Sequence, residues 1–136
     1  VKGSDVVITA TTSRTPIFKG EWLEDGTYVS GIGSHSPDAR ELDEVTIKRS
    51  KLVVDQREAA LQEAGDILMP IKDGVITDKH IYAELGEVVS GKKPGRTSKE
   101  EITLFKSCGL AVQDISTGKR IYELASKRKI GMTVAL

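Results

Sequence analysis

Residues 27–44, TYVSGIGSHSPDARELDE, constrain the fold of this chain more than any other segment. They begin with a β-rich run that includes Val29 and Ile32, and pass through a loop of small residues at 31–36. A Pro-Asp pair at 37–38 then opens a helical pattern. A strand, a tight loop and a helix N-terminus in this order are how a parallel α/β sheet presents a ligand site. The segment therefore predicts an α/β fold with a site at the carboxyl end of a strand.

Strand-like and helical patterns alternate along the chain, which predicts a parallel sheet with right-handed crossovers. The predicted strands are short apolar or β-branched runs, at 4–13, 27–33, 51–56 and 102–107. The predicted helices follow apolar residues at three- and four-residue steps, at 21–23, 38–50, 57–66, 80–91 and 108–129.

The ends of these elements carry further signals. Asp38, with Glu41 three residues on, predicts the N-terminal cap of the helix at 38–50. Gly65 is the predicted C-terminal cap of the next helix. Residues 67–80 predict irregular structure, and residues 130–136 an apolar tail.

Composition limits the partners. The length of 136 residues suits one domain, and 20 basic side chains balance 20 acidic ones, so no global field favours nucleic acid or an anionic membrane. No apolar run approaches the roughly 20 residues of a membrane span. One cysteine and two separated histidines provide no metal-ligand cluster, and the single cysteine favours a reducing cytoplasm. We therefore expect no nucleic acid, membrane or metal partner, and a cytoplasmic location.

Three predicted strand ends carry small or polar residues, at 11–13, 33–36 and 107–109. Ligands of parallel sheets sit at the carboxyl ends of the strands, so these three ends are candidates for one shared site. His35 is the imidazole among them, and its free pKa of about 6.5 suits proton transfer near neutral pH. The alternative is a histidine that simply faces solvent. Cys108 is either a reactive thiol at a helix start or a small packing residue.

The glycine-containing loop at 31–36 allows more than one interpretation. It is one residue short of the dinucleotide pattern G-x-G-x-x-G, because Ser36 occupies the third glycine position. An acid, Asp55, ends the next predicted strand, as in a dinucleotide site. The alternatives are a turn whose backbone N–H groups approach some other ligand, or a plain tight turn.

Four separated motifs carry a family resemblance. The runs GSHSPDARELDE, VVDQREAALQEAGDIL, AELGEVVSGKKPGRTSKEEITLFKSCGLAVQD and GKRIYE occur in this order. Together they resemble the second half of the ornithine cyclodeaminase/mu-crystallin family, which includes archaeal alanine dehydrogenases and several imine and amino-acid dehydrogenases. The resemblance covers residues 5–123 and is specific for the family, but it does not define the substrate.

The resemblance implies a Rossmann NAD(P) domain and a second domain that binds substrate and forms a dimer. Residues 1–136 then form a single region. It is the later part of a Rossmann-type parallel sheet with flanking helices and a long closing helix at 108–129. The cofactor fingerprint and the substrate domain are expected upstream of the counterpart of Val1. On this view the loop at 31–36 does not bind pyrophosphate, and Asp55 does not bind ribose. The half-sheet would also expose an edge near residues 6–8 and promote self-association.

The resemblance also implies roles for individual residues. Glu41 matches a motif position with a structural role. His35 stands where ornithine cyclodeaminase and the archaeal alanine dehydrogenase carry an Asp credited with proton handling, so we expect His35 to be catalytic and to contact substrate. Because a histidine offers no fixed negative charge to a substrate ammonium group, ornithine cyclisation is not expected. The residues expected to contact NAD or NADP are Thr11, Thr12, Gly33, Ser34 and Ser107, with Cys108 expected at the substrate.

The expected function is NAD(P)-dependent oxidation or reduction of small amino acids or their imines by a homodimer or higher oligomer. One alternative is a mu-crystallin-like protein whose main role is to bind a small molecule. The other is an inactive, truncated remnant that folds without binding cofactor.

Overall fold

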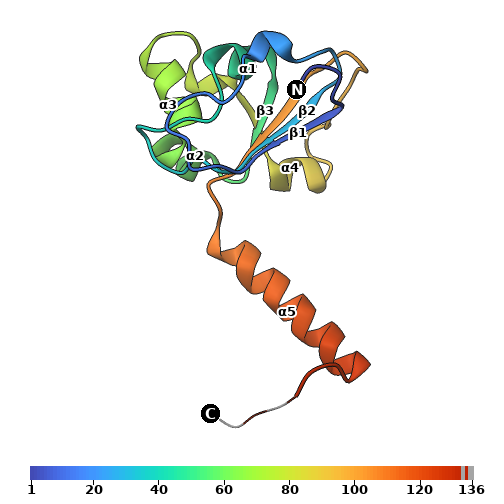
Figure 1. Ribbon diagram of the computed structural model, residues 1–136. Coiled ribbons are helices and arrows are strands. Elements are labelled where there is room, and N and C mark those ends of the chain that lie inside the picture. Colours follow the sequence, from blue (N-terminus) through green and yellow to red (C-terminus); the bar gives the residue numbers. More distant parts are fainter. Residues whose placement is uncertain (133, 135–136) are drawn as a thin grey trace.

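The computed structural model describes residues 1–132 and 134, as a parallel sheet with flanking helices and one long C-terminal helix (Figure 1). The strands are β1 (Val6–Thr9), β2 (Tyr28–Gly31), β3 (Lys51–Val54), β4 (Ile81–Glu84) and β5 (Thr103–Lys106). The helices are α1 (Glu44–Arg49), α2 (Arg57–Glu63), α3 (Gly65–Lys72), α4 (Leu85–Val89) and α5 (Ala111–Arg128), with 3-10 turns η1 (Gly20–Trp22) and η2 (Asp78–His80). All strand pairs are parallel in the order β1-β2-β5-β3-β4, which confirms the predicted α/β class.

The first main helix is shorter than predicted, and its cap is a different residue. Helix α1 begins at Glu44, and the Asp43 carboxylate accepts a hydrogen bond from the Thr46 N–H at 2.8 Å. The prediction of Asp38 as the cap is wrong, because that side chain lies in an exposed loop and pairs with Arg14. The pattern failed because residues 38–43 form a non-helical segment ahead of α1.

Residues 67–72, which were predicted to be irregular, belong to helix α3, which begins at Gly65. Helix α3 was not predicted because it contains Pro70. Proline removes an intrahelical hydrogen bond and usually breaks a helix. Gly65 opens this helix instead of capping the previous one. A Cβ at Gly65 would lie 2.1 Å from the carbonyl oxygen of Ala39, so the close approach requires glycine.

The predicted helix at 80–91 is divided between a strand and a short helix. In β4 the side chains of Ile81 and Ala83 are buried, and Ile81 pairs with Leu52 of β3. The apolar stripe that suggested a long helix belongs to the five-residue α4 that follows. Tertiary pairing with β3 decides the outcome for these four residues.

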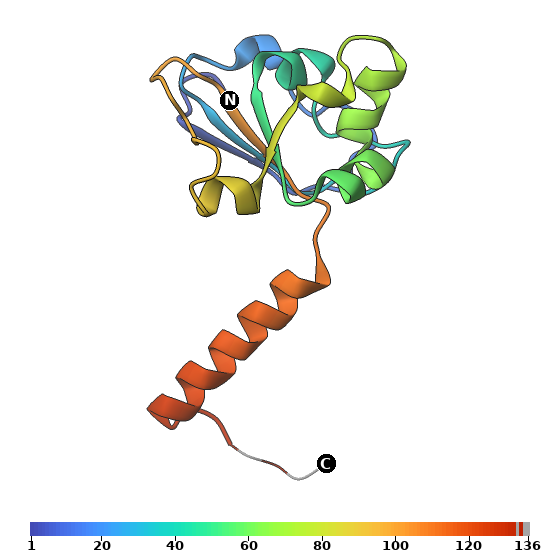
Figure 2. The ribbon, with the colours of Figure 1, turned by 180° about the vertical axis from the view of Figure 1, so that it is seen from behind.

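One face of the sheet carries the core. Val29, Leu104, Leu52 and Ile81 lie side by side in the strand register, and all are at most 2% exposed. Helices α1, α2 and α3 lie on this side of the sheet, and α4 lies on the other (Figure 2). The opposite face is only half-buried. Side chains of this face and of α4 line an apolar hollow of about 350 Å³. Tyr28, Val53 and Phe105 contribute from the sheet, and Leu85 and Val88 from α4.

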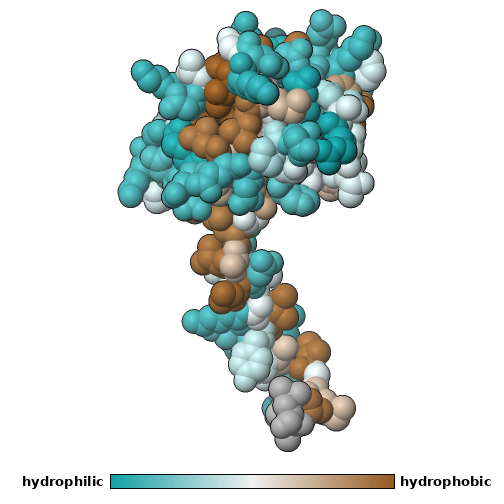
Figure 3. Space-filling model, turned by 90° about the vertical axis from the view of Figure 1, so that its left-hand side faces the viewer, coloured by the Kyte–Doolittle hydropathy of each residue, from teal (hydrophilic) through white to brown (hydrophobic). Residues whose placement is uncertain are grey.

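Helix α5 confirms the predicted long C-terminal helix but extends away from the sheet instead of closing over it (Figure 1). Apolar side chains lie exposed along it (Figure 3), and four of them are 61–74% exposed: Val112, Ile115, Ile121 and Tyr122. Strand β1 forms one edge of the sheet, as expected, with Val6 and Ile8 exposed.

Three of the residues in the predicted apolar tail, 133, 135 and 136, lie outside the described residues. Within residues 1–132 and 134, no helix combines the length and the apolar character that crossing a bilayer would require. The same part of the chain contains no cluster of three or more acidic, histidine or cysteine side chains arranged to bind a metal.

Candidate active site at the carboxyl edge of the sheet

The carboxyl ends of β1, β2 and β5 meet at one edge of the sheet, because these strands are parallel neighbours. The loops after β1 and β2 enclose a small hollow of about 160 Å³ there. Its lining residues come from two loops: Thr12, Ser13 and Arg14, and Gly33, Ser34, His35, Ser36 and Ala39. The structure therefore brings Thr12, Gly33, Ser34 and His35 together, whereas Thr11 and the corner at 107–109, which the sequence analysis expected in the same site, do not line this hollow.

His35 is exposed at this hollow, and its ring is oriented by its own loop. The Nδ1 atom lies 3.2 Å from the carbonyl oxygen of Gly33. Because a carbonyl oxygen can only accept, this contact calls for a proton on Nδ1, so that among the neutral tautomers the one protonated at Nδ1 fits. The Nε2 atom is then the basic nitrogen, and it can take or return a proton.

A buried carboxylate ties the loop after β1 to the loop after β2. Glu41 is fully buried, and its Oε2 accepts hydrogen bonds from the Thr9 hydroxyl at 2.8 Å and the Gly33 N–H at 2.9 Å. Its Oε1 accepts from the Thr11 N–H. Burial alone raises the pKa of Glu41, but the hydrogen bonds from Thr11, Thr9 and Gly33 outweigh burial and place that pKa below its ordinary value. The carboxylate is therefore ionised at neutral pH.

Gly33 is required by the close approach of these groups. A Cβ at this position would lie 2.3 Å from Glu41 Oε1 and 2.4 Å from the carbonyl oxygen of Thr11. The next residue, Ser34, is buried, and its hydroxyl donates to the carbonyl oxygen of Ala39 at 2.6 Å. The loop at 33–34 therefore contacts Glu41, Thr11 and Ala39 through backbone groups and small side chains.

A buried ion pair supports the same loop from the core. The ammonium group of Lys106, at the end of β5, donates to the carbonyl oxygen of Ser34 and lies 3.1 Å from Asp66 Oδ2. Both charged side chains are fully buried. The other carboxylate oxygen of Asp66 accepts from the N–H groups of Glu41 at 2.7 Å and Leu42 at 2.8 Å. Lys106, Asp66 and Glu41 therefore belong to one connected polar cluster.

Sequence reasoning missed this cluster as a feature of the site. One signal was available, because Lys106 stands two residues after Leu104 in a strand, and alternate residues of a strand share a face. A lysine on the buried face of a strand needs a buried partner. The sequence offered no comparable signal for Asp66, since it lies in the helix α3 that was not predicted.

Ser107 and Cys108 lie at the next corner and do not line the hollow beside His35. Asp55 Oδ2 accepts from the Ser107 hydroxyl at 2.7 Å, the Cys108 N–H at 3.1 Å and the Gly109 N–H at 3.0 Å. Asp55 thereby fixes the corner from which the chain continues into α5.

The Cys108 thiol lies in surroundings that disfavour ionisation. Burial raises its pKa, Lys106 opposes the effect, and the Asp55 carboxylate adds to it. Helix α5 begins only at Ala111, so the helix N-terminus is not adjacent to the sulfur. These observations favour the packing interpretation of Cys108 over the reactive one.

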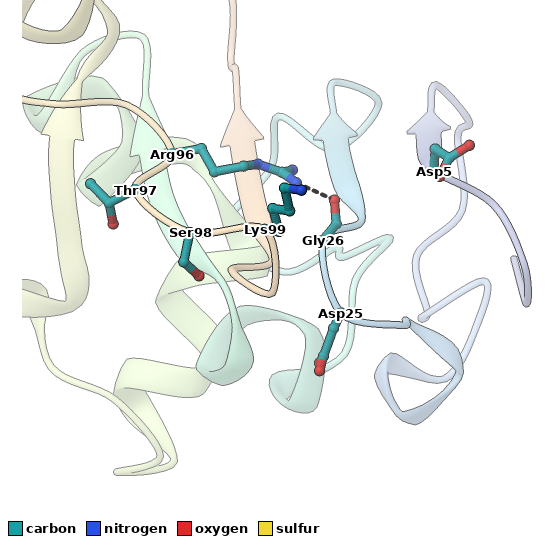
Figure 4. A pocket seen from close by; sticks show the side chains of 7 residues that line it. All are labelled: Asp5, Asp25, Gly26, Arg96, Thr97, Ser98 and Lys99. Carbon is teal, nitrogen blue, oxygen red and sulfur yellow. Dashed lines mark hydrogen bonds between the residues drawn. The ribbon is translucent and has the colours of Figure 1, made fainter.

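A larger hollow, of about 480 Å³, lies at the amino edge of the sheet (Figure 4). Asp5, Asp25 and Lys99 line it, and each of them precedes a strand. The Arg96 guanidinium donates to the carbonyl oxygen of Gly26 across this hollow. Ligands of parallel sheets sit at the opposite, carboxyl edge, so we place the candidate active site at the smaller hollow.

The sequence matches the model of the Ornithine cyclodeaminase/mu-crystallin family over residues 1–129. The chain belongs to this family. A Delta(1)-pyrroline-2-carboxylate reductase from Bacillus cereus is 46% identical over 132 residues, which cover 96% of this chain and 40% of the relative.

Two solved structures extend this comparison. The Thermococcus litoralis Delta(1)-pyrroline-2-carboxylate reductase in complex with NADH and L-proline aligns with a TM-score of 0.90 and 50% identity, over 98% of this chain and 41% of that one. An archaeal alanine dehydrogenase dimer with bound NAD aligns with a TM-score of 0.84 and 42% identity, over 97% of this chain and 41% of that one. The chain thus spans about two fifths of the length of these relatives.

Proposed function

We propose that residues 1–136 are the C-terminal part of the NAD(P)-binding Rossmann domain of an oxidoreductase that acts on small amino acids or their imines. The observation that carries the proposal is the meeting of Thr12, Gly33, Ser34 and His35 at the carboxyl edge of a parallel sheet. The Thermococcus litoralis relative, solved with NADH and L-proline at 50% identity, supports both the cofactor class and the substrate class.

The small hollow suits the nicotinamide end of such a cofactor. Six of its eight lining residues are small, Arg14 and His35 being the larger ones, and Gly33 leaves no Cβ between the two loops. We assign Thr11, Thr12, Gly33 and Ser34 to the cofactor. Ser107, one strand further along the same edge, is assigned to the cofactor as well, and Cys108 to the substrate side. NAD or NADP would supply hydride exchange at its nicotinamide ring.

His35 is the proposed proton relay. When an imine is reduced or an amino acid oxidised, a proton must reach or leave the substrate nitrogen. The Nε2 atom of His35 is the basic nitrogen of the tautomer that Gly33 favours, so it can hold that proton. The anchored loop limits the positions that the ring can take, which is the contribution that positioning makes to such chemistry.

The remaining features of the proposal concern partners and location. We propose that the complete protein takes a small amino acid or imine as substrate, works as a homodimer or higher oligomer, and resides in the cytoplasm. The archaeal alanine dehydrogenase, solved as a dimer, supports the oligomeric state. The neutral net charge supports the absence of a nucleic-acid partner.

A hybrid enzyme tests the function. The 136 residues replace the corresponding 41% of the Thermococcus litoralis reductase, and oxidation of NADH and NADPH is followed with Delta(1)-pyrroline-2-carboxylate and a panel of other imines. We expect turnover, and we expect His35→Ala to reduce it by roughly 10²-fold or more, the range of general acid–base catalysis. The matched control is His80→Ala, which removes the other imidazole, at the opposite edge of the sheet.

The outcomes separate the alternatives. A hybrid that folds and binds NADH without turnover supports a binding protein instead of an enzyme. If His35→Ala and His80→Ala retain equal turnover, His35 has no part in the reaction.

A further inference from the structure

We propose that Glu41 is a positioning residue that sets the place of His35 by clamping the loops after β1 and β2. The inference rests on the proposed function for its catalytic consequence, but its structural part can be tested without any activity. Glu41 lies in the segment ahead of α1 and does not line the hollow, so it acts through the loop and not on the substrate.

Three hydrogen-bond donors converge on the Glu41 carboxylate. A side-chain hydroxyl of β1 and backbone N–H groups of two loops all point at Glu41, from Thr9, Thr11 and Gly33. A carboxylate can only accept, so it satisfies all three donors at once. A glutamine of the same size would turn an NH₂ group toward one of these N–H donors and lose that hydrogen bond.

Two side chains hold the two residues that immediately precede His35. Glu41 holds the N–H of Gly33, and Lys106 holds the carbonyl oxygen of Ser34, the next residue. The backbone that leads into His35 is therefore fixed from both sides. Asp66 joins the anchors, because it pairs with Lys106 and accepts from the N–H of Glu41.

Asp43 provides a comparison that distinguishes a positioning role of Glu41 from a contribution to general stability. Asp43, two residues along the chain, is also a carboxylate with three donors: the N–H of Gly20 at 2.8 Å, the N–H of Thr46 at 2.8 Å and the Thr46 hydroxyl at 2.7 Å. These donors belong to η1 and α1 and not to the loops at the hollow. Asp43→Asn is thus a matched control for Glu41→Gln, because each converts one carboxylate to its amide.

Hydrogen exchange tests the structural part in the 136-residue chain. In Glu41→Gln we expect the amide that faces the new NH₂ group, that of Thr11 or that of Gly33, to exchange roughly tenfold faster or more, the effect of losing a hydrogen bond to a charged group. In Asp43→Asn these two amides should keep their wild-type rates while the Thr46 amide exchanges faster. Equal rates for Thr11 and Gly33 in the two variants overturn the proposal.

The hybrid enzyme tests the catalytic part. We expect Glu41→Gln to lower turnover by roughly 10- to 100-fold, the cost of a small misplacement of a reacting group. Asp43→Asn should leave turnover unchanged. Because Glu41 acts through His35, Glu41→Gln should add no further loss in the His35→Ala background, whereas a merely structural role would lower both backgrounds equally. Equal losses in the two backgrounds overturn the positioning role.

A milder variant covers the case in which Glu41→Gln does not fold. Thr9→Val keeps the side-chain volume and removes one donor to Glu41, so it should speed exchange at Gly33 by a smaller factor. Unchanged exchange there contradicts the clamp. If exchange responds as expected but the wild-type hybrid has no turnover, the clamp stands and the proposed function fails.

Discussion

The two edges of the sheet are built on different principles. At the carboxyl edge, buried charged side chains form hydrogen bonds with the loop backbone, as Glu41 does with Gly33 and Lys106 with Ser34. At the amino edge, the larger hollow is lined by exposed charges such as Asp25 and Lys99. The smaller hollow is thus bordered by loops that are anchored from the core, whereas the larger one is bordered by exposed charged side chains.

The largest effect is expected for Lys106→Met. This change leaves the Asp66 carboxylate buried without its counter-charge, so we expect a loss of about 3–5 kcal/mol in the free energy of unfolding. Urea denaturation measures it. The control is Lys51→Met at the amino edge, which breaks a partly exposed pair with Glu101 and a hydrogen bond to the Gly95 carbonyl oxygen and should cost less, about 1–2 kcal/mol. Equal losses would erase the contrast between the edges.

Gly33→Ala should have the next largest effect. The new methyl group would meet Glu41 Oε1 and the Thr11 carbonyl oxygen at less than 2.5 Å, so the two loops must separate. We expect a loss of about 1–3 kcal/mol in thermal or urea denaturation. Gly95→Ala, near the amino edge, meets only Val88 at an ordinary 3.6 Å and should be tolerated. A tolerated Gly33→Ala would show that the loops are not tightly held.

Acid denaturation should distinguish the edges more finely. Because the pKa of Glu41 is lower in the folded protein than its ordinary 4.5, the stability that it contributes is complete above about pH 4.5. That stability is lost as pH falls through the lowered pKa. Glu41→Gln should therefore flatten the acid limb of a plot of unfolding free energy against pH.

Glu101→Gln is the amino-edge comparison. Burial raises the pKa of Glu101, but hydrogen bonds from Thr97 and Lys51 outweigh burial and lower it. The sign is therefore the same as for Glu41. Because the Glu101 side chain is 24% exposed, solvent screens its interactions, and we expect a smaller flattening of the acid limb. A larger effect from Glu101 would reverse the ranking of the edges.

The smallest effect is expected for Arg96→Ala at the amino edge. Its guanidinium bonds the Gly26 carbonyl oxygen and the Thr103 hydroxyl, and both contacts are exposed. We expect a change of about 0.5 kcal/mol or less in urea denaturation, the usual range for surface positions. A loss comparable to that of Gly33→Ala would mean that this edge, too, is rigidly built.

Local sequence patterns predicted the architecture better than the interior of the site. Strands such as β3 and β5 were visible because apolar, β-branched runs suit a buried parallel strand. Strand β4 was missed because its four residues precede an apolar stripe that imitates a longer helix. The predicted loops do meet, but the groups that hold them come from distant positions. Glu41 is 32 residues from Thr9, and Lys106 is 72 from Ser34, so no local pattern could connect them.

The corner held by Asp55 has a mechanical consequence for α5. The 18 residues of this helix make a rod roughly 27 Å long, so a turn of about 10° at its base would shift its far end by roughly 5 Å. Asp55 holds the base of the helix, whereas Glu41 and Lys106 hold the loop at 33–34. A change of direction at this corner would therefore move the far end of α5 by several ångströms without breaking the hydrogen bonds that hold the loop at 33–34.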